Sequence, residues 1–112
     1  MLSLPPSVRI FVARGGVDLR KSFDTLAALV REVLKQDPLS GHLFVFFNRR
    51  HDRIKVLYWD RAGFCLFYKR LEQGSFRHPD SEQIDVRQLM LVLEGIDEKT
   101  VRTRRWFAQS KA

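Results

Sequence analysis

A run of five apolar residues at 43–47 constrains the fold more than any other feature of this chain. The run is Leu43-Phe44-Val45-Phe46-Phe47, so a strand made from it would have no polar face. Such a strand lies in the centre of a sheet that is covered on both sides. Alternatively, one of its faces forms part of an interface with a partner. The run therefore predicts a central strand, buried by the chain itself or with the help of another molecule.

Strand-like runs at Arg53–Trp59 and Phe64–Leu71 follow in quick succession. The connectors between these runs are short and polar, which is typical of an antiparallel meander. A further strand is expected at 8–13, and Gly15-Gly16 is expected to break it. Together the runs predict an antiparallel sheet of four or more strands.

Two helices complete the predicted fold. Apolar residues recur at the spacing of one helical face from Asp18, which can cap the first turn, to about Lys35. A shorter helix is expected over 86–94, with Asp85 as its cap and Gly95 at its end. We predict an α+β fold in which the meander packs against the long helix and the second helix lies near the C-terminus.

Length and composition fit one globular domain. The chain has 112 residues, of which 45% are hydrophobic and 12% aromatic, and this is unlike a disordered sequence. We predict a single domain over 1–112 in which residues 98–112 form a basic tail. The one cysteine, Cys65, allows no internal disulfide. Its apolar neighbours predict a small core side chain in a buried strand, and a reactive thiol is the alternative.

The charge balance indicates the class of partner. Lys and Arg number 20 against 13 acidic residues, which gives a formal net charge of +7. Nucleic acid is the commonest polyanion that a basic cytoplasmic domain meets. Pro5-Pro6 interrupts any apolar stretch at the N-terminus, and no apolar run approaches the roughly 20 residues that span a bilayer. We expect a cytoplasmic protein that binds DNA and does not associate with a membrane.

The sequence predicts no enzyme. The carboxylates that metal-dependent DNA cleavage would require are Asp18, Asp24, Asp52 and Asp60. Each of them lies where aspartate has a structural role, as a helix cap, on a helix surface or in a turn. The three histidines are far apart and have no cysteine or histidine at ligand spacing; they are His42, His51 and His78. We therefore expect no catalytic residue, no cofactor and no metal.

Four blocks of the sequence carry a resemblance to a known family. The blocks are Asp18–Ala27, Asp37–Phe46, Asn48–Asp60, and Gly63 with Leu66–Gly74. In these blocks, and in the closing segment Leu93–Asp97, the chain resembles the small accessory protein (TnpB or Orf2-like) of the insertion sequence sixty-six family of bacterial transposons. Ser22 and Thr25 stand where the family often has glycine. The resemblance covers roughly residues 4–97.

The resemblance implies a function in transposition, in the cytoplasm and beside a separate, larger transposase. It implies no established catalytic residue. The expected partners are DNA, at the transposon ends or the target, and that transposase. A homo-oligomer is an open alternative to a monomer.

The sharpest candidate for DNA contact is the predicted hairpin tip that carries Arg49, Arg50 and Arg53. The planar guanidinium group suits phosphate, and it can also bind guanine in the major groove. Lys55 and Arg61 are expected to extend the same surface. The alternative is a solvated turn that keeps the sheet edges soluble.

Two further basic segments are weaker candidates. Arg20-Lys21 is expected in a first helical turn, where positive charge opposes the helix dipole, and this indicates an anionic partner. Near the C-terminus, an aromatic residue, Trp106, lies among basic residues that could follow a phosphate backbone while the ring stacks on a base. A frayed tail is the alternative there. The basic residues of that segment are Arg102, Arg104 and Arg105.

A second hypothesis makes the protein an interaction module. Aromatic residues crowd the predicted meander, and aromatic side chains together with arginine anchor protein interfaces. They are Tyr58, Trp59, Phe67 and Tyr68. In this alternative the protein bridges transposase subunits without specific DNA binding.

Overall fold

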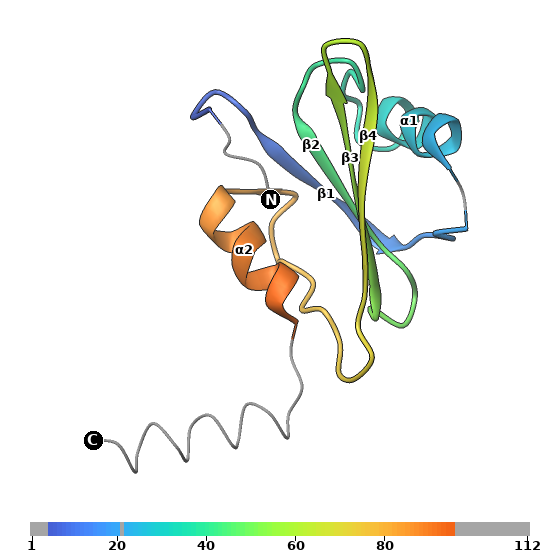
Figure 1. Ribbon diagram of the computed structural model, residues 1–112, viewed down its shortest axis with the longest axis vertical. Coiled ribbons are helices and arrows are strands. Elements are labelled where there is room, and N and C mark those ends of the chain that lie inside the picture. The colour runs from blue at the N-terminus through green and yellow to red at the C-terminus, as the bar shows by residue number, and fades with distance from the viewer. Residues whose placement is uncertain (1–4, 21, 96–112) are drawn as a thin grey trace.

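A five-stranded mixed sheet, with one helix on each side, forms the body of the protein (Figure 1). The computed structural model describes residues 5–20 and 22–95. The strand order across the sheet is β4-β3-β2-β1-β5. In chain order the elements are β1 (Ile10–Gly16), α1 (Phe23–Glu32), β2 (Leu43–Phe47), β3 (Arg53–Asp60), β4 (Gly63–Arg70), β5 (Gln83–Ile84) and α2 (Val86–Glu94).

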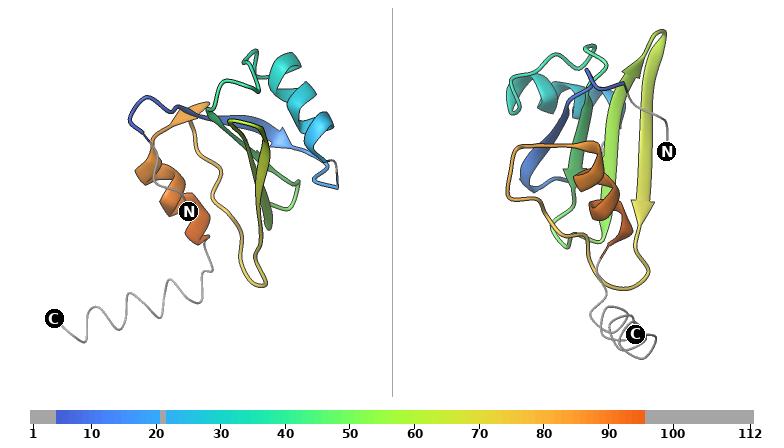
Figure 2. Two further views of the ribbon diagram at one scale, coloured as in Figure 1. Left: turned by 45° about the horizontal axis from the view of Figure 1, so that its top comes forward. Right: turned by 90° about the vertical axis from the view of Figure 1, so that its left-hand side faces the viewer.

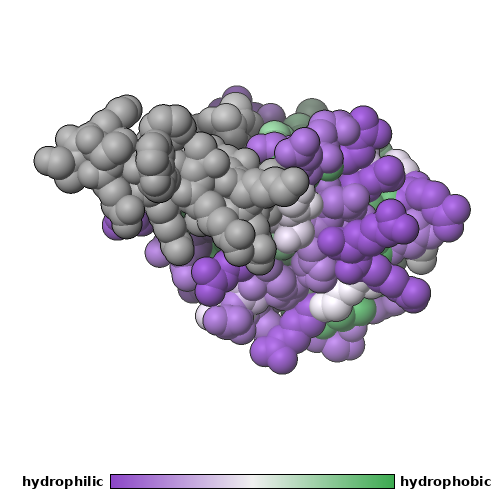
Figure 3. Space-filling model, turned by 90° about the horizontal axis from the view of Figure 1, so that it is seen from below, coloured by the Kyte–Doolittle hydropathy of each residue, from purple (hydrophilic) through white to green (hydrophobic). Residues whose placement is uncertain are grey.

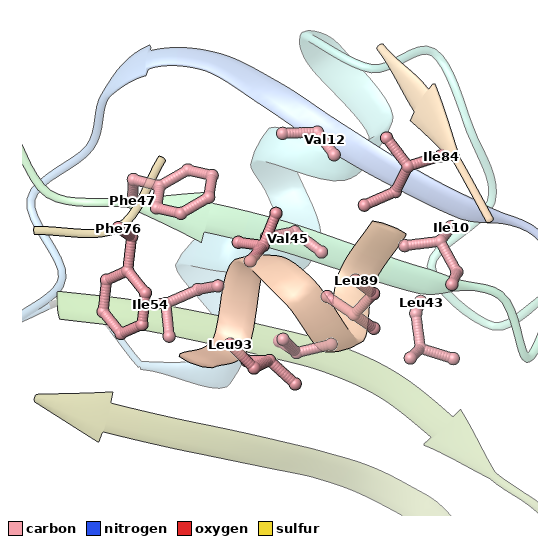
Figure 4. Packing of buried hydrophobic residues seen from close by; sticks show 12 residues of the cluster. Ile10, Val12, Leu43, Val45, Phe47, Ile54, Phe76, Ile84, Leu89 and Leu93 are labelled. Carbon is pink, nitrogen blue, oxygen red and sulfur yellow. The ribbon is translucent and has the colours of Figure 1, made fainter. Parts of the chain in front are cut away.

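The strand β2 is central, and all five of its side chains are buried. Leu43, Val45 and Phe47 belong to the core cluster that includes α2, whereas Phe44 and Phe46 belong to the cluster that includes α1. Figure 2 shows the sheet between the two helices, and Figure 4 shows α2 side chains packed over the sheet. Because successive side chains of a strand point to opposite faces, the two-sided apolar run needs a cover on each face, and the chain supplies both.

The predicted meander is confirmed for three strands, because β2 pairs antiparallel with β3 and β3 with β4. The wholly antiparallel sheet is wrong, because β1 pairs parallel with β2. The reason is the connection: α1 carries the chain back across one face of the sheet, so β2 enters in the same direction as β1. The glycines at 15 and 16 do not break β1, which continues to Gly16.

The first helix is shorter than the sequence predicts. It begins at Phe23, and Ser22 occupies the N-cap position, so Asp18 is not the cap. The Asp18 carboxylate instead accepts a hydrogen bond from the backbone N–H of Arg20 (3.0 Å). This local bond closes a turn ahead of the helix, which is the common alternative use of aspartate near a helix start. The predicted single long helix over 18–35 is therefore wrong at both ends.

The second helix is confirmed over 86–94. The Asp85 side chain accepts from the backbone N–H of Gln88 (2.7 Å), and the Gln88 side chain accepts in return from the Asp85 N–H. This reciprocal pair satisfies two backbone donors at the helix start. The helix follows β5, a two-residue strand that pairs with β1 and that the sequence analysis missed. No helix in the described part of the chain is long and apolar enough to cross a membrane.

Candidate nucleic-acid interface

The end of β1 lies directly against the turn that joins β2 to β3. Gly16 pairs with Phe47, and the N–H of Val17 donates to the carbonyl oxygen of Phe47 (2.8 Å). A Cβ atom on Gly16 would lie 2.5 Å from Cγ and 2.7 Å from Cα of Arg49. Because no side chain fits at that separation, glycine at position 16 allows the close approach. The segment 17–20 is thereby held beside the 48–52 turn.

The 48–52 turn is fixed by the side chain of Asn48. The amide oxygen of Asn48 accepts from the N–H of Arg53 (3.0 Å), and its amide nitrogen donates to the Asp52 carboxylate. This bond holds the pKa of Asp52 below its ordinary value, and the charges of Arg53 and Arg50 act in the same direction. A hydrogen bond to the ionised form of a carboxyl group favours that form.

Two later segments of the chain also bind the 48–52 turn through their backbones. The N–H of Leu71 donates to the carbonyl oxygen of Asp52 (2.8 Å), and the N–H of Phe76 donates to that of His51 (2.6 Å). The ring of His51 packs on Phe47, with 5.5 Å between ring centroids, and on His78, at 5.6 Å. The turn is therefore held by contacts from several other segments of the chain.

A hollow of about 490 Å³ lies between the 17–20 segment and the 48–52 turn. Three arginines, Arg20, Arg49 and Arg53, line it together with one carboxylate, Asp18. Arg20 forms an ion pair with Asp18 (3.0 Å). The sum of these charges is positive, so the hollow suits an anionic group. The remaining lining residues are Gly16, Val17, Leu19 and Asn48.

The positive charge continues from the hollow onto the sheet face that carries α1. Arg53 of β3 lies opposite Arg70 of β4, and Lys55 lies opposite Tyr68 in the next pair on the same face. Nζ of Lys55 lies 4.9 Å from the centre of the Tyr68 ring. Arg70 also pairs with Glu72 (3.0 Å). Like charges directly opposite each other across a strand pair are unfavourable, and a bound anion would relieve that cost.

We call these residues the basic surface. It comprises Arg20, Arg49, Arg53, Tyr68 and Arg70. Lys55 lies on the same face but is buried, with 7% of its surface exposed. Sequence reasoning missed Arg70 as a member of the basic surface. The signal that could have found Arg70 is the two-residue turn at 61–62, which sets the register of β3 and β4 and so places Arg70 opposite Arg53. Figure 3 shows the molecule from below the view of Figure 1, where hydrophilic side chains cover most of the described surface.

The structure brings together some of the predicted contact residues and separates others. Arg20, Arg49 and Arg53 meet at the hollow. Lys55, which was expected to extend this surface, lies on the same face as Arg53 but is buried. Arg50 is exposed in the turn but does not line the hollow. Lys21, Arg102, Arg104 and Arg105 lie outside the described residues.

The prediction that Arg61 extends the surface of the 48–52 turn is wrong. Arg61 lies in the turn between β3 and β4, and the eight residues of β3 separate that turn from the other one (Figure 1). An eight-residue antiparallel strand is about 25 Å long. Arg20 also differs from its prediction, because it precedes α1 and does not lie in a helical turn.

The remaining candidate groups lie in other surroundings. Within residues 5–20 and 22–95, no three His, Cys, Asp or Glu side chains gather to hold a metal ion. The ring nitrogens of His78 lie 3.1 Å from the Ala13 carbonyl oxygen and 2.7 Å from that of Pro79, so this histidine joins the loop to β1. Cys65, expected in the core, is only half-buried on β4.

Comparison with known proteins identifies the family. A family model described as IS66 Orf2 like protein matches residues 8–103. The chain belongs to the IS66 Orf2-like protein family. The resemblance drawn from the four sequence blocks is thereby confirmed, and the match extends beyond residue 97. Membership in this family implies an accessory role associated with transposition.

Two relatives from Sinorhizobium fredii (strain NBRC 101917 / NGR234) align over nearly the whole chain. The protein named uncharacterized protein y4hO is 45% identical over 101 residues, which covers 87% of this chain and 88% of the relative. Uncharacterized protein y4jC is 34% identical over 108 residues, covering 93% and 92%. No solved structure matches the chain. The relatives therefore support the family and add no biochemical assignment.

Proposed function

We propose that this protein is a non-catalytic accessory protein of transposition that binds DNA through its basic surface. The observation that supports the proposal best is the approach of Arg20 to Arg49 and Arg53 around one hollow, which Gly16 makes sterically possible. Arginines from two separate segments converge there. A solvated turn, which is the alternative for the 48–52 segment, would not require a second segment to approach it.

The chemistry of the basic surface fits a phosphate backbone. The planar guanidinium group of arginine forms paired hydrogen bonds to phosphate oxygens, and three such groups line the hollow. Beside them, Tyr68 is 48% exposed, so part of its ring is free to contact a sugar or a base. The expected partners are DNA, at the transposon ends or the target, and the separate transposase of the same element.

Binding to labelled duplexes over a series of salt concentrations tests this function. One duplex carries the terminal inverted repeat of the element, and the other carries the same bases in scrambled order. Preference for the repeat makes the protein an end-recognition factor. Equal binding that weakens steeply with salt makes it a sequence-independent DNA clamp, because released counterions dominate such binding. Absence of binding to both duplexes refutes the DNA function.

A second candidate function is an interaction module that contacts the transposase without specific DNA binding. The observation that favours it is on α2, where Val86, Met90 and Leu91 are 43%, 51% and 61% exposed. Of the aromatic residues that first suggested this function, Tyr58, Trp59 and Phe67 are half-buried. The α2 side chains are therefore the better candidates for such a contact. Retention of transposase binding by a protein that binds neither duplex would favour this function.

A further inference from the structure

One edge of the sheet is long and open. In the sheet formed by the described residues, β4 is an edge strand of eight residues, whereas the strand at the opposite edge, β5, has two. An antiparallel strand that pairs on one side directs about half of its backbone N–H and C=O groups away from its neighbour. These groups along β4 form a template on which another strand can pair.

The first five residues of β4 lack the features that usually protect such an edge. The segment 63–67 has no charged residue and no proline, and Phe64, Leu66 and Phe67 are half-buried. Natural sheets commonly place lysine or proline on an exposed edge to prevent pairing. An uncharged edge of this length is open to pairing with another strand.

The two cations at the end of β4 are engaged within the chain. Nζ of Lys69 donates to the carbonyl oxygen of Leu93 at the end of α2 (2.7 Å). Arg70 donates to the carboxylate of Glu72 (3.0 and 3.2 Å). These contacts direct the charged groups toward α2 and toward the next segment of the chain. The cations therefore do not protect the uncharged part of the edge.

We infer that β4 pairs with β4 of a second copy of this chain, antiparallel and about a twofold axis. A parallel arrangement would place Lys69 and Arg70 beside the same residues of the partner. The antiparallel arrangement separates the two charged ends by the length of the strand, about 25 Å, which exceeds the Debye length in physiological salt. It also places the uncharged segment 63–67 of one copy near the uncharged segment of the other.

This pairing makes one continuous sheet from two copies. The twofold axis is perpendicular to the sheet, so the faces that carry α1, and the basic surfaces with them, lie on the same side of the dimer. A twofold dimer is the commonest symmetric assembly of soluble proteins, and the same strand serves as both halves of its interface. The inference rests on the β4 edge and does not depend on the proposed DNA function.

Sedimentation velocity of the full chain over a range of concentrations tests the inference. The native chain is expected to sediment at twice the monomer mass. Cys65→Lys, which places a charge in the uncharged segment of both copies, is expected to raise the dimer dissociation constant at least tenfold. Leu91→Lys is the matched control, because it replaces an exposed apolar residue by lysine on α2, and it should leave the dimer unchanged.

Circular dichroism checks that both variants fold, and hydrogen exchange provides a second readout on the native chain. Amides of β4 should exchange more slowly as the protein concentration rises, because pairing protects them. If the native chain is monomeric at every concentration and its β4 amides are unprotected, β4 does not pair with a second copy and the inference is overturned. A different protein would then be the candidate partner of this edge. Loss of the dimer in Leu91→Lys but not in Cys65→Lys also overturns it, and places the interface on α2.

Discussion

The two turns at opposite ends of β3 look alike in sequence but differ in their surroundings. Each carries exposed arginine, and each has a non-glycine residue with positive φ, His51 at 56° in one and Arg61 at 52° in the other. The 48–52 turn receives backbone hydrogen bonds from Leu71 and Phe76 and lies against Gly16. Within residues 5–20 and 22–95, the only backbone bond of the 61–62 turn outside the strands is the local one from the N–H of Ala62 to the carbonyl oxygen of Asp60.

This comparison shows what separates a candidate site from a solvated turn. Arginine is present in both turns, so composition does not distinguish them. The 48–52 turn is fixed in position and has Arg20 brought to it from another segment. Several charges held in one place can act on one ligand, whereas a single exposed arginine on a local turn contributes little. Variants at matched positions in the two turns therefore test the account.

The largest effect is expected from Gly16→Ala. Its Cβ would meet backbone atoms of Arg49 at 2.7 and 2.9 Å, so either the strand end or the turn must shift. The free energy of unfolding should fall by about 2–3 kcal/mol, in the range of overpacked sites. Gly63→Ala beside the 61–62 turn is the control, because nothing lies within 4 Å of its Cβ position. It should change stability by less than about 0.5 kcal/mol. Urea unfolding of both variants measures the difference.

A smaller effect is expected from Asn48→Ala. The change removes the amide group that bonds the backbone of Arg53 and the carboxylate of Asp52. Loss of a partner for a partly buried donor should destabilise the protein by about 1–2 kcal/mol. Asp60→Ala, at an exposed residue of the opposite turn, should cost less than about 0.5 kcal/mol. Equal losses in the two variants would contradict the distinction between the turns.

The smallest effect concerns pH. Because the pKa of Asp52 is lower in the folded protein, its bond to Asn48 contributes stability above the ordinary carboxyl value of 3.8. That contribution disappears as the pH falls through the lowered pKa. In Asn48→Ala the pKa of Asp52 should return toward 3.8. Titration of the carboxyl carbon by NMR measures both values, and identical curves for the two proteins would remove Asn48 as the cause.

Much of the fold could be predicted because local patterns decide it. The apolar run of β2, the short connectors of the meander and the Asp85 cap of α2 each act within a few residues. The parallel pairing of β1 with β2 depends on which strand edge β1 joins after the crossover, and no local signal specifies that choice. The strand β5 is two residues long and exists only through its pairing with β1. The sequence pattern could not predict it.

The candidate site could be predicted only where its residues are close together in the sequence. The arginines of the 48–52 turn are adjacent in sequence, so they were visible as a cluster. The approach of Arg20 depends on the close contact between Gly16 and Arg49, which joins positions 33 residues apart. In the sequence, Gly15-Gly16 predicts the end of a strand, because glycine has the same appearance whether it ends a strand or admits a neighbour. The place of Arg70 beside Arg53 could be predicted only from the register of β3 and β4.

The salt dependence of DNA binding tests whether Arg20, Arg49 and Arg53 form one DNA-binding surface. The triple variant R20A/R49A/R53A is compared with R31A/R61A/R87A, which removes equal charge from exposed arginines elsewhere. The first variant should reduce the magnitude of the slope of log affinity against log salt by about 2–3, and the second should change it by less than about 1. Equal changes in the two folded variants would show that net charge, and not this arginine cluster, is the basis of binding.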